Sequence, residues 1–192
     1  MTKFYAIKID EPKYQTLDLD VLDVISSKPD TVSMDDIYNF CERNFSMKSW
    51  WKTPATVFMD SEDGVKGLMP DICGWVRSSV VLSPKAHRIL GGSLEQFGEL
   101  LPVQVHNETY FIFNCLTFGE ADEENCDIEY SGGVQTGLNK LKIKESAVDL
   151  LVFKCELESS LTLYCGDRFR DIVEQYGLTG ISFDEELVPD YR

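Results

Sequence analysis

The sequence LYCGDRFRDIVEQYGLTGISF, residues 163–183, holds the clearest structural signal of the chain. Its apolar residues recur at helical spacing, at Phe169, Ile172, Val173 and Tyr176. Gly177 follows as a C′ glycine, and Leu178 is placed to touch Val173, as in a Schellman motif. Strands are expected before the helix at 161–164 and after it at 180–183. The pattern therefore predicts a capped helix between two strands near the C-terminus.

A second helix start lies upstream of this segment. A short apolar strand at 78–82 runs into Ser83-Pro84, and serine as N-cap followed by proline at the first helical position is a strong start signal. We expect this helix to stop at Gly91-Gly92 and another to open at Ser93. The strands 101–105 and 109–116, on either side of His106-Asn107-Glu108, predict a hairpin.

The first 75 residues carry weaker signals. Alternating apolar residues predict an opening strand at 3–9, and 56–59 is the best strand of the following region. Ser33, with Asp36 three residues later, has the form of a capping box, so a helix is expected over 33–44. Residues 150–155 are typical of a buried strand.

These elements predict an α+β fold with short, mostly antiparallel strands packed with three or four helices, including the capped C-terminal helix. A regular βαβ alternation is absent, which argues against a doubly wound sheet. We divide the chain into an N-terminal strand-and-helix portion, residues 1–75, and a larger α+β portion, residues 76–192, and expect one compact unit.

Charge narrows the class of partner. The chain has 33 acidic and 18 basic residues, a net charge of −15, and most of the excess lies in its second half. Nucleic acids and anionic membranes require cationic neutralisation, so both are poor partners for such a surface. The acidity either serves solubility alone or steers a basic protein partner to the chain.

The chain is expected to be cytoplasmic and cofactor-free. The N-terminal stretch MTKFYAIKIDEPKYQ has no apolar core of a signal peptide, and no apolar run approaches the roughly 20 residues of a membrane span. The six cysteines are scattered without a CxxC pair, which favours reduced, structural thiols. Oligomeric state is left open.

Two groups of residues are candidates for contact with a partner. The first is an acidic run without a base: Glu120, Asp122, Glu123, Glu124, Asp127 and Glu129. It is either a solvated loop, a contact surface for a basic protein, or a calcium site, although it lacks the spacing of a calcium-binding loop. The second is Trp50-Trp51, which could form an exposed interface anchor, although one tryptophan of such a pair is usually in the core.

Catalytic signals are few. Cys165, placed just before the last helix, is the best nucleophile candidate, with His87 or His106 as its base. Gly132 to Gly137 fits the outer frame of a phosphate loop but lacks the lysine and hydroxyl that give such a loop its function. No paired Cys or His spacing indicates a zinc site.

The order of motifs in the second half resembles the immunity proteins of bacterial polymorphic toxin systems, specifically the eleventh immunity family. The motifs are the strand YFIFNCLT with Tyr110 and Asn114, and the closing helix with its YGLTG turn and Phe183. The resemblance spans roughly residues 78–183, and more loosely the opening strand. Cys165 departs from it, since a serine-like cap is expected there, and no binding residue is carried over.

The resemblance implies a cytoplasmic protein that binds and neutralises a cognate toxin. The expected partner is a toxin domain, basic if the acidic residues contact it. Two other functions stay open. The chain could be a toxin chaperone or secretion adaptor, or a detoxifying enzyme that uses Cys165.

Overall fold

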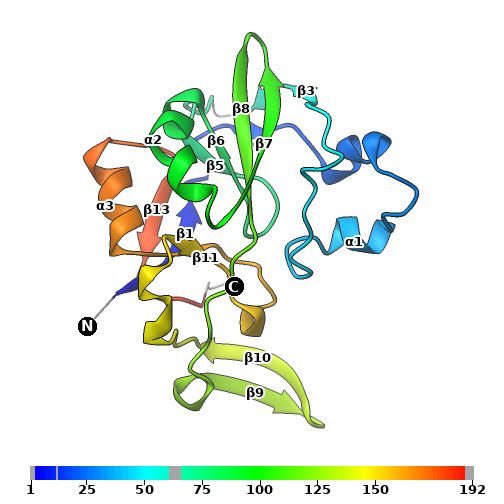
Figure 1. Ribbon diagram of the computed structural model, residues 1–192. Coiled ribbons are helices and arrows are strands. Elements are labelled where there is room, and N and C mark those ends of the chain that lie inside the picture. The colour runs from blue at the N-terminus through cyan, green and yellow to red at the C-terminus, as the bar shows by residue number, and fades with distance from the viewer. Residues whose placement is uncertain (1–2, 12, 61–65, 189–192) are drawn as a thin grey trace.

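The computed structural model describes residues 3–11, 13–60 and 66–188 (Figure 1). Its two larger sheets have the strand orders β3-β7-β8-β6-β5 and β11-β12-β1-β13. The strands of the first are β3 (Ala55–Thr56), β7 (Gly98–Val105), β8 (Glu108–Cys115), β6 (Val80–Leu82) and β5 (Ile72–Gly74). Those of the second are β11 (Val152–Phe153), β12 (Tyr164–Gly166), β1 (Phe4–Ile9) and β13 (Ile181–Asp184). Strands from both sides of residue 75 share both sheets.

Two small sheets and the helices complete the fold. β2 (Thr16–Leu17) pairs with β4 (Phe58–Met59), and β9 (Asp127–Ser131) pairs with β10 (Val134–Lys140). The α-helices of the described residues are α1 (Met34–Tyr38), α2 (Pro84–Leu94) and α3 (Asp167–Gln175). The described residues also contain four 3-10 helices: η1 (Val21–Ser27), η2 (Glu123–Asn125), η3 (Glu145–Asp149) and η4 (Glu156–Glu158). Only the β3–β7 pair is parallel among the strand pairs of this part of the chain, so the α+β prediction is confirmed.

The main core lies between the two larger sheets and beneath α2 and α3. Tyr5 and Ile7 of β1 face it, whereas Ala6 packs into another cluster on the opposite side of the strand. The predicted alternation of β1 is therefore confirmed, and both faces of the strand are covered. A further cluster joins the N-terminal portion to β7 and β8 through Phe40, Met47 and Leu101.

The end of α3 forms as predicted. The N–H of Leu178 donates to the carbonyl of Val173 at 3.0 Å, and the N–H of Gly177 donates to that of Glu174 at 3.1 Å, with φ of +55° at Gly177. This is the Schellman pattern. Tyr176 departs from the prediction that placed it on the apolar stripe: it is the C-cap residue, and 51% of it is exposed.

The predicted break at Gly91-Gly92 is wrong, because α2 runs through both glycines to Leu94. The Ser83 hydroxyl caps the helix as expected, accepting from the Ala86 N–H at 3.1 Å. Gly91 faces the ring of His87, which lies 2.8 Å from the position a Cβ would occupy. The glycine therefore makes room for the histidine inside a continuous helix, and Leu94 extends the buried stripe.

Two N-terminal elements are shorter than predicted. The capping box of Ser33 and Asp36 is present, but α1 ends at Tyr38 and the chain turns so that Phe40 and Cys41 become buried. The expected strand at 56–59 is interrupted at Val57, where β3 ends before β4, and the two pieces pair with different strands. In both places, contacts with distant strands override the local pattern.

Asp71 joins the start of α2 to the turn before β13. Its carboxylate accepts from the Lys85 ammonium at 3.0 Å and from the Thr179 N–H at 3.1 Å. Burial acts to raise the pKa of Asp71, but these donors outweigh it and hold the pKa below the usual 3.8. Because the unfolded chain then binds the proton more readily, the stabilisation is present near neutral pH and is lost as pH falls through the depressed pKa.

We expect Asp71→Asn to lower the free energy of unfolding at pH 7 by about 1–3 kcal/mol, since it weakens a charge-assisted network. The loss should shrink as the pH falls through the depressed pKa of Asp71, because below it the wild-type carboxyl is itself protonated. Urea denaturation of both proteins at several pH values measures this. A loss that is constant with pH would mean that the ionised carboxylate is not the stabilising form.

Candidate interaction site

The acidic segment belongs to an arm that we define as residues 120–144. The arm contains η2 and the β9–β10 hairpin, which projects away from the larger sheets at the bottom of Figure 1. Gly132 and Gly133 form its two-residue turn with φ of +59° and +82°, as a type I′ turn requires. Residues 127–131 of the acidic segment therefore form a strand and not a loop, and all of them except Ile128 are exposed. The frame of the phosphate loop, Gly132 to Gly137, is part of the same hairpin.

The base of the arm is fixed to the body of the protein. Two backbone hydrogen bonds hold the outgoing and returning segments of the arm together at its base. The Asp122 N–H donates to the Lys142 carbonyl at 2.7 Å, and the Lys144 N–H donates to the Glu120 carbonyl at 2.9 Å. Leu138 packs against the cluster that contains Phe153 and Tyr164. These contacts give the arm a defined direction.

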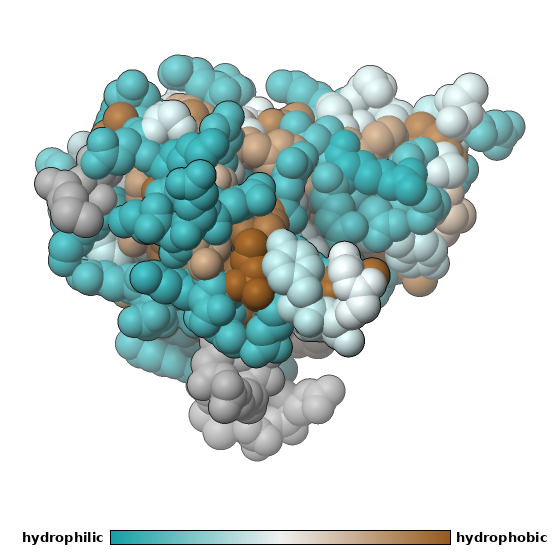
Figure 2. Space-filling view, turned by 90° about the horizontal axis from the view of Figure 1, so that it is seen from below, coloured by the Kyte–Doolittle hydropathy of each residue, from teal (hydrophilic) through white to brown (hydrophobic). Residues whose placement is uncertain are grey.

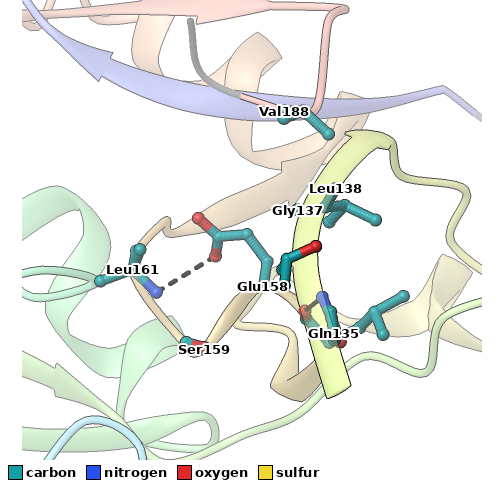
Figure 3. A pocket seen from close by; sticks show the side chains of 9 residues that line it. Gln135, Gly137, Leu138, Glu158, Ser159, Leu161 and Val188 are labelled. Carbon is teal, nitrogen blue, oxygen red and sulfur yellow. Dashed lines mark hydrogen bonds between the residues drawn. The ribbon is translucent and has the colours of Figure 1, made fainter. Parts of the chain in front are cut away.

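A cleft of about 510 Å³ separates β10 from the loop at 157–161 (Figure 3). The side chains of Leu138, Glu158 and Leu161 gather around it, and Gln135 crosses at one side, donating to the Leu157 carbonyl at 3.0 Å. Glu158 is held in place because it accepts from the Leu161 N–H at 3.1 Å. The hairpin therefore stands off the body over much of its length.

The distal arm, which we define as the β9–β10 hairpin at 127–140, is exposed on most of its side chains. In β9 only Ile128 is partly buried, and Leu138 and Gly137 are the partly buried residues of β10. Tyr130 is 62% and Val134 is 67% exposed, the latter the highest value among the large hydrophobic side chains of the described residues. Seen from below, the molecule is mostly hydrophilic, with a small hydrophobic group near its centre (Figure 2).

The arm is negatively charged and weakly neutralised. Of the six predicted acids, only Glu120 forms a salt bridge within the described residues, with Lys144 at 3.1 Å. That hydrogen bond raises the pKa of Lys144, and the charges of Asp122 and Glu123 raise it further. Lys142 and Lys144 lie at the base of the arm, and Lys140 is the cross-strand partner of Asp127 in the hairpin, so Glu129 is the carboxylate that lies beyond all three lysines. With six carboxylates and three lysines, the arm as a whole carries a net charge of −3.

Such an arm can attract and bind a basic protein surface, because carboxylates that lack cationic partners steer positive charge towards them. No family model and no curated protein matches this chain. The candidate site therefore rests on the projection, exposure and charge of the arm. No helix of the described residues is long and apolar enough to cross a membrane.

The structure places the predicted acids at one site but separates the tryptophans from it. Trp50 and Trp51 are partly buried against the cluster of Phe40 and Met47. The Trp51 indole N–H donates to the Pro102 carbonyl at 2.9 Å, and its ring meets Trp75 edge-on. The prediction of an exposed anchor is therefore wrong for both residues, which attach the N-terminal portion to β7.

The exposed anchors are Tyr130 and Val134, which the sequence reasoning missed. They flank Ser131-Gly132-Gly133, and a Gly-Gly pair between two short runs of β-forming residues is a recognised hairpin signal. That signal was present in the sequence, whereas the exposure of the two side chains depends on how the arm leaves the body.

Cys165 is a core residue. It lies in β12 with 0% exposure, and Gly166, not Cys165, is the N-cap of α3. Burial raises the pKa of its thiol far above the usual range, which disfavours the thiolate that a nucleophile requires. The prediction that Cys165 sits at the helix N-terminus is therefore wrong by one residue, because the strand continues into it.

The two histidines occupy ordinary positions. His87 stacks on Phe111 with 3.7 Å between ring centroids, and burial lowers its pKa. His106 is exposed in the β7–β8 turn. No group of three Cys, His, Asp or Glu side chains in the described ranges could hold a metal ion.

Proposed function

We propose that this chain is a cytoplasmic immunity protein that binds a cognate toxin domain and neutralises it by occlusion. The observation that carries the proposal is the projecting arm, which combines an excess of carboxylates over lysines with the exposed apolar side chains of Tyr130 and Val134 near its end.

The charges and the exposed side chains play separate parts in this proposal. The carboxylates accelerate encounter with a basic surface and select against acidic proteins. Tyr130 and Val134 then supply apolar area, and tyrosine is enriched among the residues that dominate binding energy. Tight occlusion of a toxin requires an interface of about 1,600 Å², larger than the arm tip alone, so residues beside the arm must contribute.

The resemblance of residues 78–183 to immunity proteins supports the same function. That resemblance rests on fold-defining positions, such as the α3 cap and the β8 strand, and not on the arm. The two lines of support are therefore independent: one concerns the scaffold and the other concerns the surface that the scaffold carries.

The proposal is tested by co-expressing the chain with the toxin domain encoded beside its gene and measuring growth. We expect the wild type to restore growth, and the double variant Asp127→Lys/Glu129→Lys to fail because it reverses the charge of the distal arm. The matched control is Glu95→Lys/Glu108→Lys, which makes the same change in net charge at exposed positions away from the arm. Equal rescue by both double variants would remove the arm from the proposal.

The same assay separates the two alternatives. A chaperone or secretion adaptor would bind the toxin without restoring growth. A detoxifying enzyme would restore growth without a stable complex, and Cys165→Ala would abolish that rescue. Because Cys165 is buried in the core, we expect Cys165→Ala to protect cells as the wild type does, provided that the variant is expressed at the same level.

A further inference from the structure

The outer edge of β9 is an open strand edge. β9 has one neighbour, β10, and no backbone hydrogen bond joins 127–131 to any other strand within the described residues. The irregularities of register fall on β10, at Thr136 and Asn139, so β9 keeps five regular residues, DIEYS. Proteins commonly block an open edge with a bulge, a proline or charged side chains, and of these β9 has only the carboxylates of Asp127 and Glu129.

The turn determines which backbone groups face this edge. Ser131 and Val134 are paired across the two-residue turn, so Ser131 directs its backbone groups to β10. In an antiparallel ladder the direction of the backbone groups alternates from one residue to the next, so those of Glu129 also point to β10. The N–H and C=O groups of Ile128 and Tyr130 consequently point outward and are available to another strand.

The side chains alternate in the complementary way. Asp127, Glu129 and Ser131 share one face of β9, and Ile128 and Tyr130 share the other. A strand added at the edge would place its residues about 5 Å from these side chains. Lysine or arginine would be favoured opposite the carboxylates, and apolar residues on the face of Ile128 and Tyr130.

We propose that β9 receives an extended basic segment of the partner protein as an added strand, with lysine or arginine at every second position. This inference rests on the proposed function and specifies how the partner is recognised. Main-chain hydrogen bonds hold the segment, and the alternation of charge and apolar side chains selects it.

A second copy of this chain fits the edge poorly. If two β9 strands paired antiparallel about a twofold axis through Ile128 or Glu129, at least one carboxylate of each copy would lie directly opposite a carboxylate of the other. Like charges directly opposite each other are destabilising in a sheet. Charge complementarity therefore favours a cationic partner over self-association.

Amide hydrogen exchange on the full-length chain tests this directly. In the free protein we expect the amides of Ile128 and Tyr130 to exchange rapidly and that of Glu129 to be protected. Binding of the toxin domain encoded beside the gene should slow the exchange of the Ile128 and Tyr130 amides by about tenfold or more, because both amides become hydrogen-bonded. If the toxin domain binds while these two amides exchange as before, the edge is not used, although the proposed function stands.

A synthetic peptide makes the test independent of the toxin. The probe is acetyl-KVKVKVK-amide, and a peptide of alternating glutamate and valine is its control. If the toxin domain does not bind, the proposed function fails. Protection of the Ile128 and Tyr130 amides by the lysine peptide alone would still support strand addition at the β9 edge. Absence of protection with both partners overturns the inference, as does protection of the same amides by self-association of the free protein.

A pair of variants isolates the backbone contribution. Tyr130→Ala and Tyr130→Pro both remove the ring, but only proline also removes the outward N–H, and it leaves the bonds to β10 in place. We expect Tyr130→Pro to bind the toxin domain about tenfold more weakly than Tyr130→Ala. Equal affinity of the two variants, with unchanged circular dichroism, would show that the outward N–H is not used.

Discussion

Excision of the distal arm is expected to abolish binding of the toxin domain, weakening it by more than about 100-fold, while the fold persists. The variant joins Cys126 to Leu141 through two glycines and thereby removes β9, β10 and their turn. The free energy of unfolding should fall by less than about 2 kcal/mol, because Ile128 and Leu138 are the only large apolar side chains in the excised segment that are partly buried.

Urea denaturation and a binding titration on the same preparations measure the two quantities. The matched control replaces Gly132-Gly133 by Asn-Gly, which suits the same type I′ turn and keeps the arm. We expect this control to bind as the wild type does. If the excised variant were to bind within threefold of the wild type, the arm could not be the interaction site.

Glu99→Ala is expected to produce the largest loss of stability, about 3–5 kcal/mol. Glu99 lies in β7 and is 3% exposed. One carboxylate oxygen accepts from the Met47 N–H at 2.8 Å and from the Asn114 amide at 2.8 Å. The other accepts from the Ser46 hydroxyl at 2.6 Å and the Lys48 N–H at 3.0 Å. Alanine would leave the buried Met47 N–H without its acceptor and would remove one of the two bonds that the Asn114 amide donates, the other going to the Phe45 carbonyl.

Glu99→Gln provides the comparison. Its amide keeps the shape of the side chain and one accepting oxygen, but its NH₂ group meets two of the donors, so an intermediate loss of about 1–2 kcal/mol is expected. Urea denaturation monitored by tryptophan fluorescence is suitable because Trp50 and Trp51 follow the segment that Glu99 holds. A loss from Glu99→Ala that is no larger than that from Glu99→Gln would contradict this account of the network.

Local chemistry made several elements predictable. Ser33 and Ser83 cap helices, and Gly177 ends one. The β7–β8 hairpin forms as predicted, although its turn is His106-Asn107 alone and Glu108, expected in the turn, begins β8. Each of these features depends on residues within a few positions of one another. Sequence patterns at that range report backbone geometry directly.

The features that escaped prediction depend on distant contacts. Gly91 does not stop α2 but lies inside it, where the His87 ring occupies the space that a Cβ would need. The environment of Glu99 brings together 46–48 and Asn114, and nothing in the local sequence marks that carboxylate as buried. The acids of the arm were identified as candidates from charge alone, but their exposure, and that of Tyr130, follows from the way the arm leaves the body.

We propose that this chain neutralises a toxin by binding it through the acidic arm. The most direct test of this proposed function is titration of the purified chain into the toxin domain encoded beside its gene, at low and high salt, with toxin activity measured on the same samples. We predict a stable complex that abolishes activity and whose affinity falls steeply with salt, less so for Asp127→Lys/Glu129→Lys. An active toxin that shows no binding at low salt, with both proteins folded, would contradict the claim.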